Sequence, residues 1–424
     1  KGSNAWFEMD AADILPKGFA CPHCGKSAGF TKEEDTLDGW FDSGSTHFAA
    51  MKKDQGFWPA TMYLEGLDQY RGWFQSSLLT AVGAFGEGAP FKECVTHGWT
   101  VDGEGRAMHK SLGNGVDPAD IFNENGADIL RLWAASADYH ADVRCSKAIF
   151  QQLSQNYLKF RNTCKFMLDN LVDFDPAHLT KAEDMPVLDR WLITKLNELI
   201  EKVEQSYNDY EFHIITHAVN DFCVTTLSSF YLDIVKDRLY CEAADSAERR
   251  SAQTALYLTL STLAKLFAPI LAFTCDEIWL AMPHTAEDDA RNVVLNDMNK
   301  PFTAYALDAE TMARWEHIIE VRTAVNGALE EARAAKVIGK SLEADVHLTV
   351  PEGDVFLADE NPAALADLFI VSKVELTVGG ELAVKVENAA GTKCPRCWKH
   401  SLTPNAEGLC PRCAEVVRHL PDLL

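Results

Sequence analysis

The stretch Tyr63-Leu-Glu-Gly-Leu-Asp-Gln-Tyr-Arg-Gly-Trp-Phe74 has the pattern of a strand that ends at a glycine and is followed by a helix. Acids, an amide, an arginine and aromatic residues are bunched directly behind the strand. Carboxylates and amides at the end of a strand suit an ammonium group and ribose hydroxyls. A helix N-cap followed by core aromatics explains the same residues equally well, so both interpretations stay open.

Residues 36–140 around this stretch alternate as in an α/β fold. Strand-like segments at Thr61–Leu64 and Glu93–Thr100 flank a helix-like segment at Gly72–Phe85, and glycines gather at the junctions. Because ligands of open α/β sheets bind at the carboxyl ends of strands, we expect a binding site where these strands end.

A glycine-rich loop, Asp102-Gly-Glu-Gly-Arg-Ala-Met-His-Lys-Ser-Leu-Gly-Asn114, follows the second predicted strand. Its glycines allow movement, and Lys110 and Ser111 offer a cation and a hydroxyl for charge that develops on phosphates. The glycine spacing differs from that of a Walker loop. Composition alone also allows a solvated turn with no catalytic role.

From about residue 141 the pattern becomes helical. One apolar stripe recurs every three to four residues and predicts a buried helix face: Leu188, Leu192, Leu196, Leu199 and Val203. The apolar stretch 255–273 is interrupted by polar residues and by Pro269. It therefore indicates a buried helix that ends near the proline, not a membrane span.

Further along, residues 311–388 predict a small α/β subdomain. The expected elements are a helix at Met312–Lys336, strands at Ala344–Thr349, Leu368–Val371 and Lys373–Val378, a turn at Gly379-Gly380, and a strand at Leu382–Val386 that completes a hairpin.

Four cysteines near the end of the chain form two pairs, Cys394-Pro-Arg-Cys397 and Cys410-Pro-Arg-Cys413. Two such pairs at this distance can place four thiolates tetrahedrally around one Zn²⁺. Two disulfides or four unrelated thiols are the alternatives, and the repeated spacing favours the metal. The basic residues around the pairs outnumber the acidic ones: Lys393, Arg396, Lys399, Arg412 and Arg418 against Glu407 and Glu415. Local positive charge on an acidic chain predicts contact with a polyanion, namely nucleic acid.

A lone pair, Cys21-Pro-His-Cys24, stands near the other end of the chain, and the next cysteine is Cys94. Two thiolates cannot complete a tetrahedral site. Either His23 and a distant group add ligands, or a partner pair lies outside this sequence, or the two thiols hold no metal.

The bulk composition is that of a soluble protein with several domains. The chain has 424 residues, of which 47% are hydrophobic and 24% charged, and its net charge is −24. This charge disfavours a non-specific polyanion binder, so any nucleic-acid contact must be local. Paired and single cysteines fit metal sites in a reducing compartment, so we expect a cytoplasmic protein with no membrane partner.

Taken together, these segments resemble the bacterial type of isoleucyl-tRNA synthetase, a class I aminoacyl-tRNA synthetase family. Residues 36–44 are similar to its WFDSG segment, residues 65–74 to its EGxDQxRGWF segment, and residues 108–114 to the end of its KMSKS signature. Residues 328–343 and the module 394–413 resemble its C-terminal region and zinc finger.

The resemblance implies a domain order. A zinc-knuckle segment at 1–35 precedes the C-terminal half of a class I Rossmann catalytic fold at 36–140. A helical-bundle anticodon-binding domain at 141–310 follows, then the small α/β subdomain at 311–388 and the zinc finger at 389–424.

The resemblance also implies an activity. Enzymes of this family join isoleucine to ATP as an adenylate, release pyrophosphate, and pass the acyl group to tRNA-Ile. ATP acts with Mg²⁺ as a substrate. One Zn²⁺ is expected at the C-terminal finger, and a second is expected to share Cys21 and Cys24 with residues upstream. The complete enzyme is expected to be a monomer.

Site residues are carried over at the matching positions. Lys110 matches the second lysine of the loop motif, where a cation beside the triphosphate lowers the barrier, and Ser111 and His109 stand beside it. Trp40 and Trp73 match aromatics that wall the isoleucine side chain. The remaining assignments are Glu65, Gly66, Asp68 and Gln69 for the amino acid and adenylate, Cys394, Cys397, Cys410 and Cys413 for the metal, and Arg396, Lys399 and Arg412 for tRNA.

Some features depart from the family pattern. Ala107 stands where the loop motif has its first lysine, and His109 where it has serine. Either change would slow loop closure, although a histidine can still donate to phosphate. No His-x-Gly-His signature and no editing domain are found in this sequence. We therefore expect roughly the C-terminal half of the enzyme, inactive alone but able to bind tRNA.

Two alternatives remain. A valyl- or leucyl-tRNA synthetase shares the architecture, but the C-terminal zinc module and the Glu-Glu-Ala-Arg run at 330–333 argue against both. A non-catalytic zinc-finger protein that binds nucleic acid is the other alternative, and it would not need the runs at 65–74 and 108–114.

Overall fold

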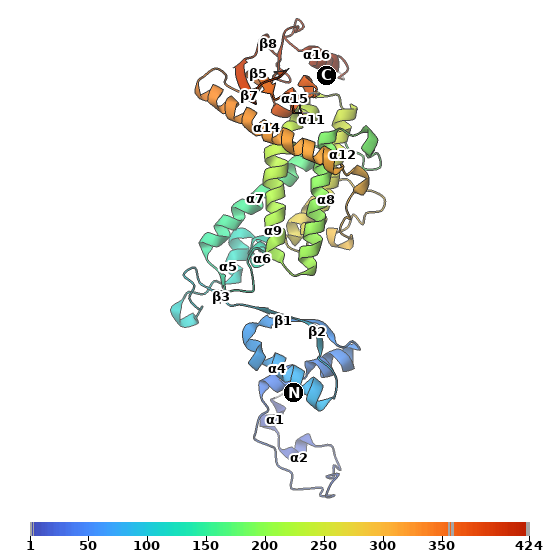
Figure 1. Ribbon diagram of the computed structural model, residues 1–424. Coiled ribbons are helices and arrows are strands. Elements are labelled where there is room, and N and C mark those ends of the chain that lie inside the picture. Colours follow the sequence, from blue (N-terminus) through green and yellow to red (C-terminus); the bar gives the residue numbers. More distant parts are fainter. Residues whose placement is uncertain (1, 3, 355–356, 358–359, 421–424) are drawn as a thin grey trace. The chain divides into compact units, whose positions relative to one another are not determined.

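The computed structural model describes residues 2, 4–354, 357 and 360–420. The chain divides into two compact units. The first runs up to Thr100 and also includes Tyr139–Asp142, and the second comprises Val101–Asp138 and the chain from Val143 onward. The part of the first unit up to Thr100 is drawn in shades of blue in Figure 1.

A parallel strand pair forms the centre of the first unit. Strand β1 (Ala60–Gly66) pairs in parallel with β2 (Phe91–His97). The crossover between them contains the 3₁₀ turn η2 (Leu67–Arg71), helix α4 (Trp73–Leu79) and the π-helical segment η3 (Thr80–Ala84). The predicted strand–helix–strand order is therefore confirmed, except that the second strand ends at His97 and the strand β3 (Thr100–Val101) is separate.

Short helices precede this β-α-β unit: α1 (Ala5–Glu8), α2 (Ala11–Ile14), α3 (Gly39–Gly44) and the π-helical segment η1 (His47–Gln55). Helix α3 packs closely on α4, because a Cβ added to Gly44 would lie 2.6 Å from the Cβ of Ser76. No residue of β2 is buried, and Leu64 of β1 and Leu79 of α4 are largely exposed. The two-stranded sheet is therefore only partly buried within its unit.

The second unit begins with a small sheet and two helices. Strand β3 pairs with β4 (Val143–Arg144), and between them lie the 3₁₀ turn η4 (Lys110–Leu112), α5 (Pro118–Asn125) and α6 (Ala127–Ser136). Asp117 starts α5 by accepting a hydrogen bond from the Ala119 N–H, and Pro118 stands at the first helical position.

A helical bundle follows, as predicted. Its helices are α7 (Lys147–Asp169), α8 (Val187–Asn208), α9 (Phe212–Asp221), the π-helical η6 (Phe222–Tyr231), α10 (Leu232–Ile234), α11 (Lys236–Cys241), α12 (Ala247–Phe267) and α13 (Ala272–Ala281), with 3₁₀ turns at Ala182–Asp184, Val293–Leu295 and Thr303–Tyr305. The long helices run side by side (Figure 1). The predicted stripe of α8 is buried throughout. Helix α12 is buried along most of its length and ends before Pro269, and no described helix is both long and apolar enough to span a membrane.

Inside the bundle, a buried carboxylate holds four helical segments together. Asp189 of α8 is fully buried and accepts hydrogen bonds from Tyr231 (2.8 Å), Ser251 (2.6 Å) and Arg238 (3.0 Å). A buried charge is tolerated only when it is paired and hydrogen-bonded in this way. Because Arg238 belongs to α11, this short helix is fixed to the core of the bundle.

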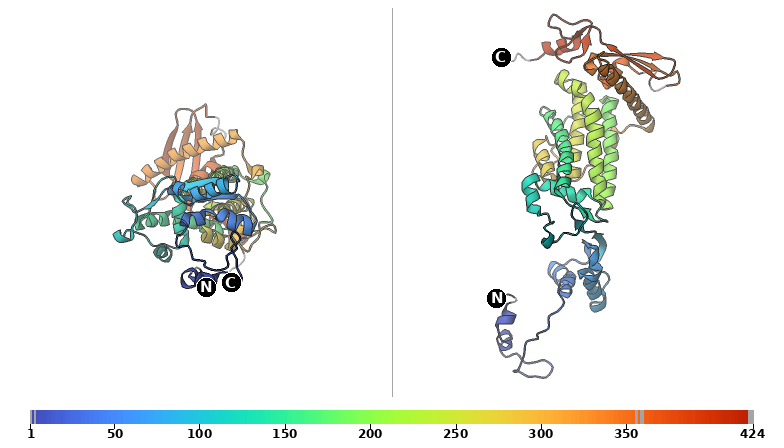
Figure 2. Two further views of the ribbon diagram at one scale, coloured as in Figure 1. Left: turned by 90° about the horizontal axis from the view of Figure 1, so that it is seen from below. Right: turned by 90° about the vertical axis from the view of Figure 1, so that its left-hand side faces the viewer.

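A three-stranded sheet follows the long helix α14 (Ala309–Ala334) and the 3₁₀ turn η9 (Ser341–Glu343). Its strands are β5 (Ala344–Val350), β6 (Lys373–Val378) and β7 (Ala383–Asn388), in the order β6-β5-β7. Strand β5 pairs in parallel with β6 and antiparallel with β7, and α14 lies against the sheet (right-hand view of Figure 2).

Two predictions in this region are wrong. The predicted strand Leu368–Val371 begins inside helix α15 (Pro362–Phe369), because the Asn361 side chain caps a helix that opens with proline. The predicted hairpin does not form, since β7 pairs with β5 instead of β6. Pairing with β5 makes that strand the centre of the sheet, where alternate residues are buried.

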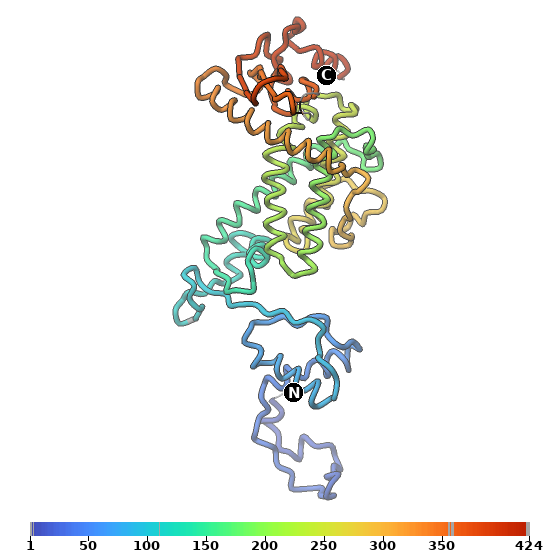
Figure 3. Tube along the Cα trace, viewed as in Figure 1, coloured from blue at the N-terminus to red at the C-terminus, as the bar shows by residue number. Residues whose placement is uncertain are grey.

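The last elements surround the terminal cysteines. Strands β8 (Thr392–Lys393) and β9 (His400–Ser401) pair antiparallel, and α16 (Pro411–Arg418) follows. In Figure 3 this red segment comes back beside the yellow-green trace of α11, a neighbourhood that direct hydrogen bonds confirm.

Candidate functional site

The carboxyl ends of β1 and β2 place polar groups next to one another. Glu65 is level with Thr96 and Gly66 with His97 in the parallel register. The Gly66 N–H donates to Glu65 Oε2 at 3.1 Å. A Cβ on Gly66 would lie 2.9 Å from Asp68 Oδ1, so the glycine lets the Asp68 side chain approach the strand end closely. The structure therefore brings Glu65, Gly66 and Asp68 together at a strand end, where ligands of α/β sheets bind.

The side chain of Gln69 stabilises the start of helix α4. Its side chain is buried, and Oε1 accepts a hydrogen bond of 3.0 Å from the Trp73 N–H at the start of α4. A Cβ on Gly72 would lie 2.0 Å from this oxygen, so the Gln69 amide fills the space that the glycine leaves. The cap interpretation of this stretch thus holds for Gln69, while Glu65 is half-buried and Asp68 exposed.

The two tryptophans lie in different surroundings. The Trp73 ring packs on Tyr63 and Phe74, with centroid distances of 4.8 and 4.5 Å. Burial raises the pKa of Tyr63, whose hydroxyl bonds Ser77 at 2.9 Å. Trp40 stands in the first turn of α3 and is 48% exposed, so its ring is available to a ligand.

Thr96 and His97 were not among the predicted site residues. His97 Nδ1 lies 2.8 Å from the Gly98 carbonyl oxygen, and the ring is only half-buried. Its Cε1 would lie 3.8 Å from a Cβ on Gly66. Ligands of α/β sheets bind at the carboxyl ends of strands. If the second strand had been predicted to end at His97 instead of Thr100, this rule would have identified both residues.

The glycine-rich loop of the second unit is closed at its base by Asp102. This buried carboxylate accepts hydrogen bonds from Asn114 Nδ2, Arg106 Nε and the N–H groups of Arg106 and Glu104, all at 2.9–3.0 Å. The Asn114 and Arg106 donors hold the pKa of Asp102 well below its usual range. Asn114 also donates to the Ala107 carbonyl at 3.1 Å, so Asp102 and Asn114 tie the two ends of the loop together.

The tip of the loop is exposed. The His109 N–H donates to Asn114 Oδ1 at 2.9 Å, and residues 110–112 form a single 3₁₀ turn. The side chains of His109 and Ser111 are exposed. The side chain of Lys110 lies outside the described residues, so its catalytic role stays a prediction.

The four C-terminal cysteines converge. The sulfur atoms of Cys394, Cys397, Cys410 and Cys413 all lie within 4.8 Å of one another. All twelve cysteines of the chain are free thiols, so neither alternative disulfide is formed. Four convergent thiols are the donor set of a closed, structural zinc site.

The electrostatics of the cluster also suit a cation. Burial alone would raise the pKa of Cys394, but the N–H groups of Cys397, Cys410 and Arg396 lower this pKa to about 6. Burial raises the pKa values of Cys397 and Cys413. One thiolate is thus preformed near neutral pH, and the buried thiols beside it would be ionised by a bound divalent ion.

The arginine of each Cys-Pro-Arg-Cys pair contacts α11. Arg412 bonds both carboxylate oxygens of Asp237 (2.5 and 2.8 Å) and also Glu242 (2.8 Å). Arg396 donates to the carbonyl oxygens of Cys241 and Tyr240 at the C-terminal end of the helix, where a cation is favourable. The two arginines therefore hold the cysteine module on α11.

Lys399 and Lys393 also form ion pairs with acidic residues of the second unit. Lys399 pairs with Asp367 of α15, and Lys393 pairs with Glu343 at 3.0 Å. Direct contact of Arg396, Lys399 or Arg412 with tRNA phosphates would have to replace these intramolecular bonds. The positive charge expected on the module is thus largely neutralised by acidic partners elsewhere in the second unit.

Comparison with known proteins gives the same picture. Residues 1–146 match the family model "tRNA synthetases class I (I, L, M and V)", and residues 189–348 match "Anticodon-binding domain of tRNA ligase". Isoleucine–tRNA ligase of Moorella thermoacetica is 47% identical over 99% of this chain and 47% of its own length. That of Syntrophotalea carbinolica is 47% identical over 98% of the chain and 46% of its own length. This chain belongs to the class I aminoacyl-tRNA synthetases.

The chain spans about half the length of the curated relatives it matches. Among solved structures, the LeuRS of Agrobacterium radiobacter in a ternary complex with tRNA and LeuAMS matches with a TM-score of 0.55 at 16% identity, over 88% of this chain and 38% of its own. That likeness concerns the fold. The predicted fold class, a class I synthetase catalytic part with a helical anticodon-binding domain and a C-terminal cysteine cluster, is confirmed.

Two site regions of this class I synthetase chain lie in different units. Glu65, Gly66, Asp68, Gln69 and the two tryptophans belong to the first unit, and the loop with His109, Lys110 and Ser111 belongs to the second. The metal cluster lies outside both ranges that the family models match. Its assignment therefore rests on the convergence of its sulfur atoms.

Proposed function

We propose that this chain is part of an isoleucine–tRNA ligase, which activates isoleucine with ATP and transfers it to tRNA-Ile. The observation that carries the proposal is the 47% identity to isoleucine–tRNA ligases over nearly the whole chain. The strand-end carboxylates and the loop described above supply the chemistry that such a reaction needs.

In the proposed reaction, the strand end of β1 holds the amino acid and the adenylate. Glu65 and Asp68 offer acceptors for the ammonium group and for ribose hydroxyls. Gln69 positions Trp73 through its cap of α4, and Trp73 and the exposed Trp40 provide apolar rings for the isoleucine side chain.

The loop acts on the triphosphate. A carboxylate oxygen of isoleucine attacks the α-phosphorus, the bond to the β-phosphate oxygen breaks, and pyrophosphate leaves with the electron pair. Negative charge concentrates on the phosphates, where we place the ammonium of Lys110 with Ser111 and His109 as hydrogen-bond donors. The Asp102–Asn114 contact fixes the loop ends, so that the exposed tip can close without unfolding its base.

We propose Zn²⁺ as the metal of the C-terminal cluster. Four thiolates leave no open coordination position, so this ion stabilises the fold and takes no part in the reaction. Cys21 and Cys24 supply half of a second site, completed by ligands from the rest of the protein.

Arg396, Lys399 and Arg412 serve tRNA binding, in this proposal, by fixing the module against α11 and α15. Their ion pairs leave few free cations on the module. These contacts therefore contribute by holding the whole module in one position. The complete enzyme is proposed to act as a monomer in the cytoplasm.

The test uses the complete protein. Isoleucine-dependent exchange of pyrophosphate into ATP is expected, with leucine and methionine inactive. Lys110→Ala should lower kcat by about 10²–10³-fold, the effect of removing one donor to a developing charge. Exchange driven by another amino acid, or none, would overturn the assignment.

The 424-residue chain is expected to form no adenylate alone, because it lacks the His-x-Gly-His signature. It should still bind tRNA-Ile in a salt-sensitive way, measured by fluorescence anisotropy. A variant lacking the four terminal cysteines is the control, and equal binding by that variant would contradict a role for the module.

A further inference from the structure

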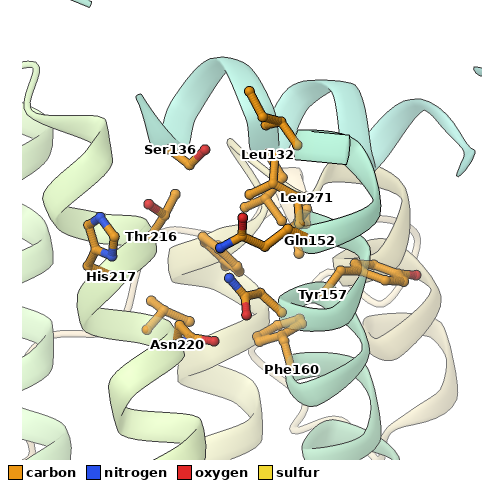
Figure 4. Close-up of a pocket in the computed structure, with 14 residues that line it drawn as sticks. Leu132, Ser136, Gln152, Tyr157, Phe160, Thr216, His217, Asn220 and Leu271 are labelled. Carbon is orange, nitrogen blue, oxygen red and sulfur yellow. The ribbon is translucent and has the colours of Figure 1, made fainter. Parts of the chain in front are cut away.

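Two hollows of the second unit differ in the chemistry of their walls. The hollow drawn in Figure 4 is lined by apolar side chains such as Leu132 and Phe160 and by amides such as Gln152, and no cysteine is among its described lining residues. Another hollow, of about 420 Å³, lies beside the cysteine module, and two thiols, Cys241 and Cys397, line it. Cys397 belongs to the metal cluster, whereas Cys241 is the last residue of α11. This hollow therefore adds a thiol that is not one of the four converging cysteines.

Cys241 packs in the same buried group as the four cluster cysteines. It is 7% exposed, and it shares this group with Cys394, Cys397, Leu409, Cys410 and Cys413. The other buried cysteines among the described residues lie in separate cores: Cys145, Cys164, Cys223 and Cys275. Five thiols therefore meet at the module, one more than a tetrahedral ion binds.

Arg396 links Cys241 to one particular cysteine of the cluster. The Cys241 sulfur lies 3.8 Å from the Arg396 carbonyl oxygen, which belongs to the backbone between two of the ligands. The Arg396 Nη1 atom donates to the Cys241 carbonyl oxygen and also lies 3.7 Å from the Cys413 sulfur. Because one nitrogen contacts both residues, Cys413 is the ligand that this arginine brings next to Cys241.

The position of Cys241 suits a change of ligand. It ends α11, and the following residue, Glu242, already has extended backbone, so no further helical turn holds the cysteine in place. Zn²⁺ is d¹⁰ and has no geometric preference from its d electrons, so any thiolate within reach can complete the tetrahedral set. On binding, Cys241 gives its thiol proton to water, because a thiol binds the ion only as the thiolate.

We propose that Cys241 is a reserve ligand of the terminal metal site, a fifth thiol that takes the position of Cys413 when the Cys413 sulfur leaves the ion. This inference rests on the proposed Zn²⁺ at the four cysteines. The ion keeps four sulfur ligands in both states. With Cys241 bound, the metal itself joins the module to α11, in addition to the arginine contacts.

The experiment starts from Cys413→Ser in the 424-residue chain and compares two second substitutions. Cys241→Ser removes the reserve ligand. Cys145→Ser is the matched control, because Cys145 is buried to the same degree, 6% against 7% exposed, in a separate core. X-ray absorption at the zinc edge counts sulfur neighbours at about 2.3 Å and separates them from oxygen at about 2.0–2.2 Å.

Four sulfur neighbours are expected in C413S and in C413S/C145S, and three sulfurs with one oxygen in C413S/C241S. Competition with a chelator should show zinc affinity at least about tenfold weaker for C413S/C241S than for C413S, since even changes outside the ligand set cost 10–100-fold. Cys241→Ser alone should keep four sulfurs, because the four cluster cysteines are intact. Three sulfurs in that variant would contradict the proposal, since Cys241 would then be a permanent ligand.

The outcomes separate the two proposals. Absence of bound zinc in the unaltered chain overturns the proposed metal site and this inference with it. Four sulfurs in the unaltered chain with three in C413S overturn the reserve ligand alone, and Cys241 is then a small apolar packing residue. This comparison needs only the single variant, so it decides the question even if the double variants do not fold.

Discussion

The two ends of the chain carry the same turn in different surroundings. In Cys21-Pro-His-Cys24, the Gly25 N–H donates to the Cys21 carbonyl at 2.9 Å, and the Cys21 N–H donates to the Lys26 carbonyl at 2.8 Å. In Cys394-Pro-Arg-Cys397, the Trp398 and Cys394 N–H groups make the equivalent bonds to Cys394 and Lys399, both at 2.9 Å. The local sequence alone therefore builds the knuckle.

The difference lies in what surrounds each turn. N–H groups of Cys24 and His23 lower the pKa of Cys21, as those of Cys397 and Arg396 help to do at Cys394. Cys24 is nevertheless exposed, and no further thiol lies within ligand distance of it among the described residues. Cys394 instead meets a second pair at the start of α16. A Cys-x-x-Cys turn prepares two ligands, and only tertiary contacts complete a site.

Removing metal ligands should give the largest effect. Cys394→Ser with Cys397→Ser is expected to lower the zinc content from one ion per chain to none, and to unfold the module. Apparent binding energies of such four-ligand sites are on the order of 10 kcal/mol. Elemental analysis by mass spectrometry measures the loss. The matched control, Cys21→Ser with Cys24→Ser, should leave the content unchanged, and a fall in the control would show that this turn binds metal alone.

Removing the arginine contacts comes next. Arg412→Ala deletes three charge-assisted hydrogen bonds to Asp237 and Glu242 and should lower the free energy of unfolding of the second unit by about 1–3 kcal/mol. Urea titration followed by circular dichroism measures this change. His23→Ala, which alters the corresponding part of the exposed turn, should change it by less than about 0.5 kcal/mol. Equal effects would mean that the arginine does not hold the module in place.

The pH dependence of metal binding at the C-terminal cysteine cluster should change by one proton near pH 6. Above pH 6 Cys394 is already ionised without metal, so it releases no proton on binding. Below pH 6 its thiol is protonated and must release one. The slope of log affinity against pH should therefore be steeper by about one below pH 6, and affinity should fall as the pH falls. Zinc competition with a chelator between pH 5 and 8 tests this, and an unchanged slope would contradict the lowered pKa.

Backbone strain gives the smallest expected difference. Gly25 and Trp398 both adopt left-handed backbone, with φ of +70° and +65°. No atom lies within 4 Å of a Cβ on Gly25, so Gly25→Ala should cost only the conformational strain of about 1 kcal/mol. Hydrogen exchange at the Cys21 and Gly25 amides should accelerate accordingly.

At the C-terminal turn, the test replaces Trp398, which has the left-handed backbone, by glycine. Trp398→Gly should be more stable than Trp398→Ala by about 1 kcal/mol, because both lose the ring and only alanine keeps the strain. Thermal unfolding of the two variants measures this difference. Equal stabilities would show that the turn is not strained at Trp398.

Local patterns allowed much of the fold to be predicted. The stripe of α8, the strand–glycine–helix order at β1 and the turn within each cysteine pair follow from spacing and from turn chemistry. The strand end at His97 and the pairing of β7 with β5 were not predicted, because they depend on which segments lie next to one another. For the same reason, the acidic partners of Arg412 and Lys399 could not be identified beforehand.

The sequence by itself determined the elements whose energetics are local: the buried face of a helix, the cap of α4 by Gln69, and the turn of each cysteine knuckle. Tertiary structure decided what those elements meet. Arg412 lies 175 residues from Asp237, and Ser251 lies 62 residues from its buried partner Asp189. Hydrogen bonds within a few residues are specified by spacing, whereas contacts between distant segments depend on the packing of the whole core, which no short stretch encodes.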